Sequence, residues 1–122
     1  MRRAALIAIA ALPLASCAGP MNVPVAVVSK GVPQGIMRGT ITVSVSEGVG
    51  YFNVSSGALS CAGTYSLGHL LPTFSVPVLC NDGRKGIVIA TRDYGGMSGG
   101  GTFTLTDGTA GDFIFGDAAN KL

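Results

Sequence analysis

Few residues in this 122-residue chain could carry covalent or catalytic chemistry: three cysteines and one histidine. A serine-type hydrolase needs an imidazole as its general base, and His69 is the only one in the sequence. It lies in "SLGHLLP", where glycine and proline are typical of a turn. We therefore interpret His69 as an exposed turn histidine, predict that the protein is not an enzyme, and turn to the cysteines.

Cys17 ends the only long apolar run in the chain. The sequence opens with the basic Met1-Arg2-Arg3, and residues 4–14 are almost entirely apolar. That run is shorter than the roughly 20 residues that cross a bilayer, and its charge pattern is typical of a secretory signal peptide. An ordinary signal peptide cut at a nearby Ala-x-Ala-like site, with Cys17 as a plain buried cysteine, is the alternative.

The four residues Leu14-Ala15-Ser16-Cys17 resemble the lipobox of bacterial lipoprotein precursors. The resemblance implies cleavage between Ser16 and Cys17, a diacylglycerol on the Cys17 thiol and an acyl chain on the new amino terminus. Two or three acyl chains hold a protein firmly on a membrane. Ala18 stands where lipoproteins retained at the inner membrane typically have aspartate, so the resemblance favours the outer membrane of a Gram-negative bacterium. We expect no other cofactor and no metal.

Charge and composition change beyond the predicted leader at residues 1–16. Residues 17–122 carry six basic and six acidic side chains, so nothing resembles the basic surface of a nucleic-acid-binding protein. Proline and glycine interrupt residues 19–39, which predicts a lipidated tether over residues 17–38 with at most a short strand at residues 25–28. We expect one folded domain over residues 39–116 and a C-terminal tail over residues 117–122.

Alternation of apolar and polar residues predicts strands throughout that domain. "GTITVSVS" places Ile41, Val43 and Val45 on one face, and similar segments continue as far as "GDFIFG". Residues 81–83 and 106–108 each end in glycine, which accepts the backbone conformation of a tight hairpin turn. The prediction is an all-β antiparallel meander of six to eight strands, as a closed barrel or a flattened sandwich.

Cys61 and Cys80 remain as an even pair if Cys17 carries lipid, and an oxidising compartment favours a disulfide between them. A hairpin folding about His69 and Leu70 would place Cys61 opposite Cys80. The same register puts Tyr65 opposite Val76 and Leu67 opposite Phe74, so the bridge and the apolar side chains share one face. A redox or metal-binding pair is the alternative, but the spacing is not Cys-x-x-Cys.

The remaining polar residues offer little support for catalysis. Asp82 and Asp107 belong to predicted turns, and Asp112 and Asp117 flank a predicted strand, so a catalytic carboxylate pair is not favoured. The glycine-rich "YGGMSGGG" and "DGTAGD" lack phosphate- and calcium-binding patterns and are interpreted as flexible hairpin loops. Three basic residues that bracket one strand form either a small basic spot for an anionic partner or a solvated strand border: Arg84, Lys85 and Arg92.

Residues 60–116 also resemble small uncharacterised proteobacterial lipoproteins, through "CAGTYS", "PVLCNDGRKG" and the closing "FIFG". That resemblance implies the fold and the bridge, and no activity. We expect a membrane-anchored, non-enzymatic structural or binding accessory of the cell envelope, with an envelope protein as a possible partner. The alternative is a periplasmic inhibitor of a wall-degrading hydrolase such as lysozyme.

Overall fold

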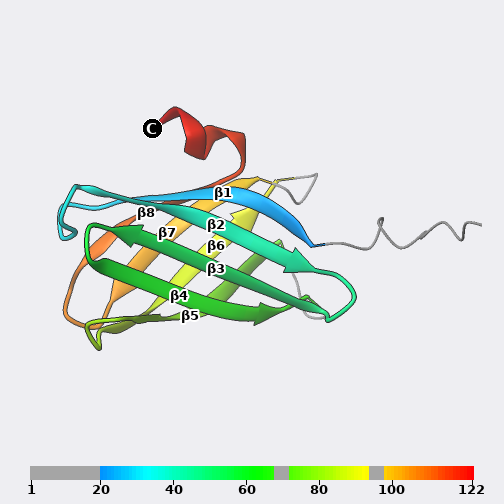
Figure 1. Cartoon of the computed structure of the whole chain (residues 1–122), viewed down its shortest axis with the longest axis horizontal. Helices are drawn as coiled ribbons and strands as arrows, with labels where there is room; N and C mark the ends of the chain where they lie inside the picture. The colour runs from blue at the N-terminus through cyan, green and yellow to red at the C-terminus, as the bar shows by residue number, and fades with distance from the viewer. Residues whose placement is uncertain (1–19, 68–71, 94–97) are drawn as a thin grey trace, which may run out of the picture.

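A computed structural model describes residues 20–67, 72–93 and 98–122, and these form a closed antiparallel barrel of eight strands. Each strand pairs with the next, and β1 pairs with both β2 and β8 to close the wall (Figure 1). The strands are β1 (Met21–Val28), β2 (Ile36–Ser44), β3 (Val49–Ser56), β4 (Leu59–Ser66), β5 (Thr73–Cys80), β6 (Lys85–Arg92), β7 (Gly99–Leu105) and β8 (Ala110–Phe115). The all-β meander prediction is confirmed, and the barrel is the correct alternative.

Side chains alternate between the interior and the surface along the strands. In β3, Phe52 and Val54 are buried while Tyr51 and Asn53 face outward. An eight-stranded barrel is just wide enough for side chains to fill it or to hold one small ligand. One apolar core lies inside the barrel, with Phe103, Met37 and Leu105 among its largest fully buried side chains.

Glycine at inward positions lets the strands of this narrow barrel approach one another. A β-carbon at Gly39 would overlap the carbonyl oxygen of Asn53, and one at Gly101 would overlap that of Ile89. The prediction of flexible loops for the glycine-rich segments is therefore wrong for residues 99–101, which belong to β7, and for residues 110–112, which belong to β8. Gly99 and Gly101 are required by close backbone contact within the sheet, as glycine in a strand often is.

The barrel begins earlier than the sequence predicted. All of residues 21–28 form β1, and β2 starts at Ile36, so much of the expected tether over residues 17–38 is barrel wall. Pro24 is tolerated in β1 because its nitrogen lies where no amide proton is needed. The Pro24 carbonyl oxygen accepts a hydrogen bond from the Gly116 amide, so the Pro24 nitrogen faces the same side. That position is just beyond the end of the β1–β8 ladder.

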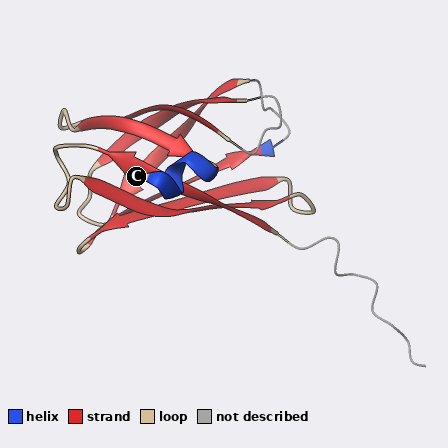
Figure 2. Cartoon of the chain, turned by 90° about the horizontal axis from the view of Figure 1, so that it is seen from above, coloured by secondary structure: helices blue, strands red, loops and turns tan. Residues whose placement is uncertain are grey.

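The expected C-terminal tail is also structured. Residues Asp117–Lys121 form the short 3₁₀ helix η3, which packs against β1 and β8 on the outside of the barrel (Figure 2). Ala119 is buried, and Arg38 donates hydrogen bonds to the carbonyl oxygens of Ala119 and Leu122. Within the described residues, no helix is long and apolar enough to cross a bilayer.

Candidate functional site

The barrel has two unlike ends, which we name by what they hold. The disulfide rim carries the turns that come after β1, β3, β5 and β7. The cavity rim lies at the other end, where β1 begins at Met21 and where β2, β4, β6 and β8 finish. Figure 1 shows the first residues of β1 at this second end.

A disulfide joins Cys61 of β4 to Cys80 of β5, with an S–S distance of 2.02 Å. The predicted bridge is confirmed, and Cys61 lies directly opposite Cys80, as the predicted register requires at that pair. Among the described residues the β4–β5 ladder covers this pair and Ala62–Leu79. The ladder ends before Pro77. The Pro77 carbonyl oxygen faces β4, so the Pro77 nitrogen faces β4 as well. Because a proline nitrogen carries no proton, it cannot donate a hydrogen bond to β4.

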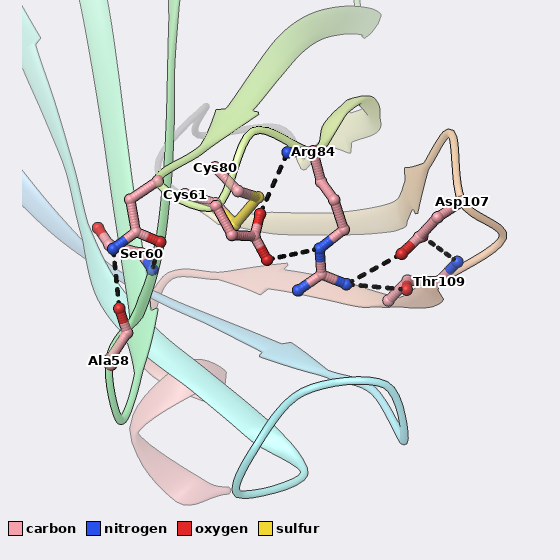
Figure 3. Close-up of a disulfide and its surroundings, with 9 residues drawn as sticks. Ala58, Ser60, Cys61, Cys80, Arg84, Asp107 and Thr109 are labelled. Atoms are coloured by element: carbon pink, nitrogen blue, oxygen red, sulfur yellow. Dashed lines mark hydrogen bonds and ion pairs between the residues drawn. A yellow bond between two sulfur atoms is a disulfide. The ribbon is translucent and has the colours of Figure 1, made fainter.

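Arg84 links two neighbouring hairpin turns of the disulfide rim (Figure 3). Its Nε lies 2.8 Å from Asp82 Oδ2, and its Nη1 lies 3.2 Å from Asp107 Oδ2. A hydrogen bond from the Arg84 amide, with help from the guanidinium, lowers the pKa of the Asp82 carboxyl. The Thr109 amide and hydroxyl, and then Arg84, lower the pKa of the Asp107 carboxyl. The carboxylates predicted to shape turns do so here.

Further hydrogen bonds tie the remaining turns of this rim together. Asn81 Nδ2 donates to the Ala58 carbonyl, and the Ser60 amide donates to Asn81 Oδ1, at 2.8 and 3.0 Å (Figure 3). Ser29 Oγ donates to the Ala110 carbonyl at 2.6 Å. The polar groups of the disulfide rim thus bind one another, which is what a structural closure requires.

The cavity rim encloses an apolar cavity of about 110 Å³. Fourteen described residues line it, and Arg92 is the one among them with a charged side chain. The deepest part is formed by core residues including Phe52, Val88 and Phe113. Concave apolar sites with one or two placed polar groups are the usual form of small-molecule sites. This cavity is therefore the candidate functional site.

Three side chains form a cluster where the cavity meets its rim. The Tyr65 and Phe74 rings lie 5.4 Å apart, and the Arg92 guanidinium lies 5.8 Å from the centre of the Phe74 ring. Burial raises the pKa of the Tyr65 hydroxyl, and the nearby charge of Arg92 opposes that rise. Cations attract the faces of aromatic rings, so Phe74 helps to hold the guanidinium in a partly apolar setting.

Tyr65 keeps this position because the neighbouring strand has no side chain beneath it. A β-carbon at Gly50 would lie 2.7 Å from the Tyr65 Cε1 atom and closer still to Cζ. Gly50 is directly opposite Tyr65 in the β3–β4 ladder. The ring can therefore lie across Gly50, at the edge of the cavity.

The structure separates the three basic residues for which the sequence left open one basic spot or a solvated strand border. Arg84 and Lys85 lie at the disulfide rim, whereas Arg92 lies at the cavity rim, at the other end of β6. Eight strand residues at about 3.3 Å each keep them more than 20 Å apart. A shared basic spot is therefore wrong. Cys17, Ser16 and His69 lie outside the described residues, so lipidation, cleavage and the turn histidine stay predictions.

The cavity itself was not predicted from the sequence. The sequence of β6 nevertheless contains an indication of the cavity. Val88, Ala90 and Arg92 are every second residue of the strand, and the first two are buried. Extending that alternation by two residues places Arg92 on the inner face. Comparison of the chain with protein-family models, curated proteins and solved structures found no match.

Proposed function

We propose that this protein is a lipid-anchored, non-enzymatic binding accessory of the cell envelope, whose barrel takes up a small apolar group. The apolar cavity, with Arg92 as the one charged side chain among the described residues that line it, carries the binding part of the proposal. The lipobox at residues 14–17 carries the anchor. A disulfide is consistent with an oxidising compartment outside the cytoplasm.

The anchor and the cavity belong to the same end of the protein. β1 begins at Met21, which lines the cavity, four residues after Cys17. Four residues of fully extended chain span at most about 14 Å. A lipid on Cys17 would therefore hold the cavity rim close to the bilayer surface, with the disulfide rim pointing away from it.

Metabolic labelling tests the anchor. Radioactive palmitate should label the full chain expressed in a Gram-negative host, and the labelled protein should fractionate with the outer membrane. Cys17→Ala should remove the label, while Cys61→Ala, which removes a different cysteine, should leave it. Equal labelling of the protein and the Cys17→Ala variant would contradict the anchor.

Ligand titration tests the binding part separately. A chain secreted behind a cleavable leader with Cys17→Ala keeps all the described residues and needs no detergent. Toluene, a neutral apolar probe, should shift NMR resonances of cavity residues, and Ala90→Leu, which fills the cavity, should abolish the shifts. Ile89→Leu changes the outer face of the same strand and serves as the control. Unchanged spectra at saturating toluene would contradict a binding cavity.

The alternative of a hydrolase inhibitor stays a prediction. The same soluble protein tests it in a lysozyme assay, where no inhibition at micromolar protein would exclude it for the lysozymes used.

A further inference from the structure

We propose that the cavity binds a medium-chain carboxylate, with its alkyl chain inside the barrel and its carboxylate on Arg92. This inference deepens the proposed function and rests on its binding part. It depends on the charge of the rim, the direction of the Arg92 side chain and the size of the cavity.

The charge at the rim selects an anion. Arg92 occupies an inward position of β6, in line with the buried Val88 and Ala90, and is itself half-buried. The nearest acid along the chain, Asp93, is exposed and accepts a hydrogen bond from Ser98 at 3.0 Å. Asp93 does not line the cavity, so the charge that the described lining residues present at the rim is positive.

The guanidinium chemistry favours a planar, two-oxygen anion. Arginine binds carboxylates through two parallel N–H donors, which fixes orientation as well as affinity. Attraction between the Arg92 guanidinium and the Phe74 ring, 5.8 Å apart, helps to keep the charged group at the rim. A carboxylate bound there would direct the first carbons of its chain down toward Val88 and Phe113, which line the cavity below.

The cavity volume limits the chain. A cavity of about 150 Å³ lined by apolar side chains takes up benzene, so 110 Å³ has room for about four to six carbons. Affinity should therefore rise about fourfold for each methylene group up to about six carbons and then level off, because further methylenes stay in water. A membrane phospholipid has two chains that are too long for this space.

Titration calorimetry on the soluble Cys17→Ala chain tests the inference with hexanoate, hexanol and hexylamine. Hexanoate should bind at least about tenfold more tightly than hexanol, because a charged hydrogen bond is lost with the alcohol. Hexylamine should bind more weakly than hexanol. Butanoate, octanoate and dodecanoate should show the rise and the plateau.

Two substitutions on β6 locate the carboxylate. Arg92→Gln should weaken hexanoate binding about tenfold or more and leave hexanol unchanged. Lys85→Gln removes a cation at the other end of the same strand and should change neither. The comparison of ligands on the unaltered protein needs no variant to fold.

Distinct outcomes would overturn the inference. Equal affinity for hexanoate and hexanol would exclude recognition of the carboxylate, while binding of both would leave the proposed function intact. A steady gain up to dodecanoate would exclude the size limit. Displacement of hexanoate by phosphatidylglycerol vesicles, but not by phosphatidylcholine vesicles, would make an anionic lipid the ligand instead. Binding of neither toluene nor hexanoate would overturn the proposed binding function as well.

Discussion

The two rims of the barrel are formed by different kinds of contact, although the same eight strands run between them. At the disulfide rim, a covalent bridge and the Arg84 network join neighbouring hairpins, and the polar groups bind one another. At the cavity rim, aromatic side chains and Arg92 line a cavity that the side chains of the described residues leave open. One rim is thus held together by covalent and polar contacts, while the other holds the cavity to which we assign ligand binding.

Packing differs between the two halves, and matched phenylalanine substitutions measure the difference. Phe103 is fully buried in the half nearer the disulfide rim, whereas Phe74 is partly exposed beside the cavity. Phe103→Ala should cost about 3–5 kcal/mol of unfolding free energy, because it leaves a closed void in dense packing. Phe74→Ala should cost less than half as much. Urea denaturation measures both, and equal losses would show that the two halves are packed alike.

The bridge should contribute the next largest effect. Replacing both Cys61 and Cys80 with alanine should destabilise the barrel by about 3 kcal/mol, the chain-entropy value for a loop of this length. Toluene binding at the other rim should be unchanged when the variant is measured below its unfolding transition. Reductant should lower the urea midpoint of the parent and leave that of the double variant unmoved. A double variant as stable as the parent would contradict a stabilising bridge.

Alanine substitutions at two inward glycines compare a site beside rigid backbone with a site beside a movable side chain. A β-carbon at Gly86, near the disulfide rim, would overlap the backbone carbonyl of Thr104, which cannot move aside cheaply. Gly86→Ala should therefore cost about 1–3 kcal/mol. Gly50→Ala meets the movable Tyr65 ring and should cost less, while shifting Tyr65 resonances. Similar losses in thermal unfolding would mean that the Tyr65 ring is held as firmly as backbone.

Acid should weaken the disulfide rim by the smallest amount. The folded protein lowers the pKa of Asp82 and Asp107, so the unfolded chain binds more protons in mildly acidic solution. The stability from these groups is present above their unfolded pKa of about 3.9 and is lost as pH falls through the lower folded values. Asp82→Asn with Asp107→Asn should reduce the fall in Tm between about pH 5 and pH 2. Asp112→Asn, an exposed carboxylate on β8, is the control, and an identical fall in both variants would contradict the assignment.

Local signals in the sequence predicted the disulfide rim well. The turns at residues 81–83 and 106–108 carry their own conformational signature, and Gly83 and Gly108 have the positive φ angles it requires. The Cys61–Cys80 register was predicted from alternation within one hairpin. Interactions within a single hairpin are enough to specify such features.

Features that depend on closure were not predicted. Residues 21–28 contain Asn22 and Pro24 and resemble a tether, because their value as a strand comes from pairing on two sides with β2 and β8. Likewise, glycines 99–101 resemble a loop until the neighbouring carbonyl oxygens are in place. The cavity depends on side chains from many strands, so no single segment indicates it. Val45, expected on the inner face, lies in the turn after β2 and is exposed.

Pairing of β1 with β8 sets the order in which the protein can mature. The ladder pairs Val25 with Phe115, so the barrel wall cannot close until almost the whole chain is present. Such long-range pairing slows folding, because the chain must close a large loop first. The proposed function requires a precursor that is exported unfolded. For such a precursor, this delay in closure keeps the polypeptide competent for translocation until its last strand has crossed the membrane. A chain truncated before residue 110 would lack β8, the closing partner of β1, and would remain an open, aggregation-prone sheet.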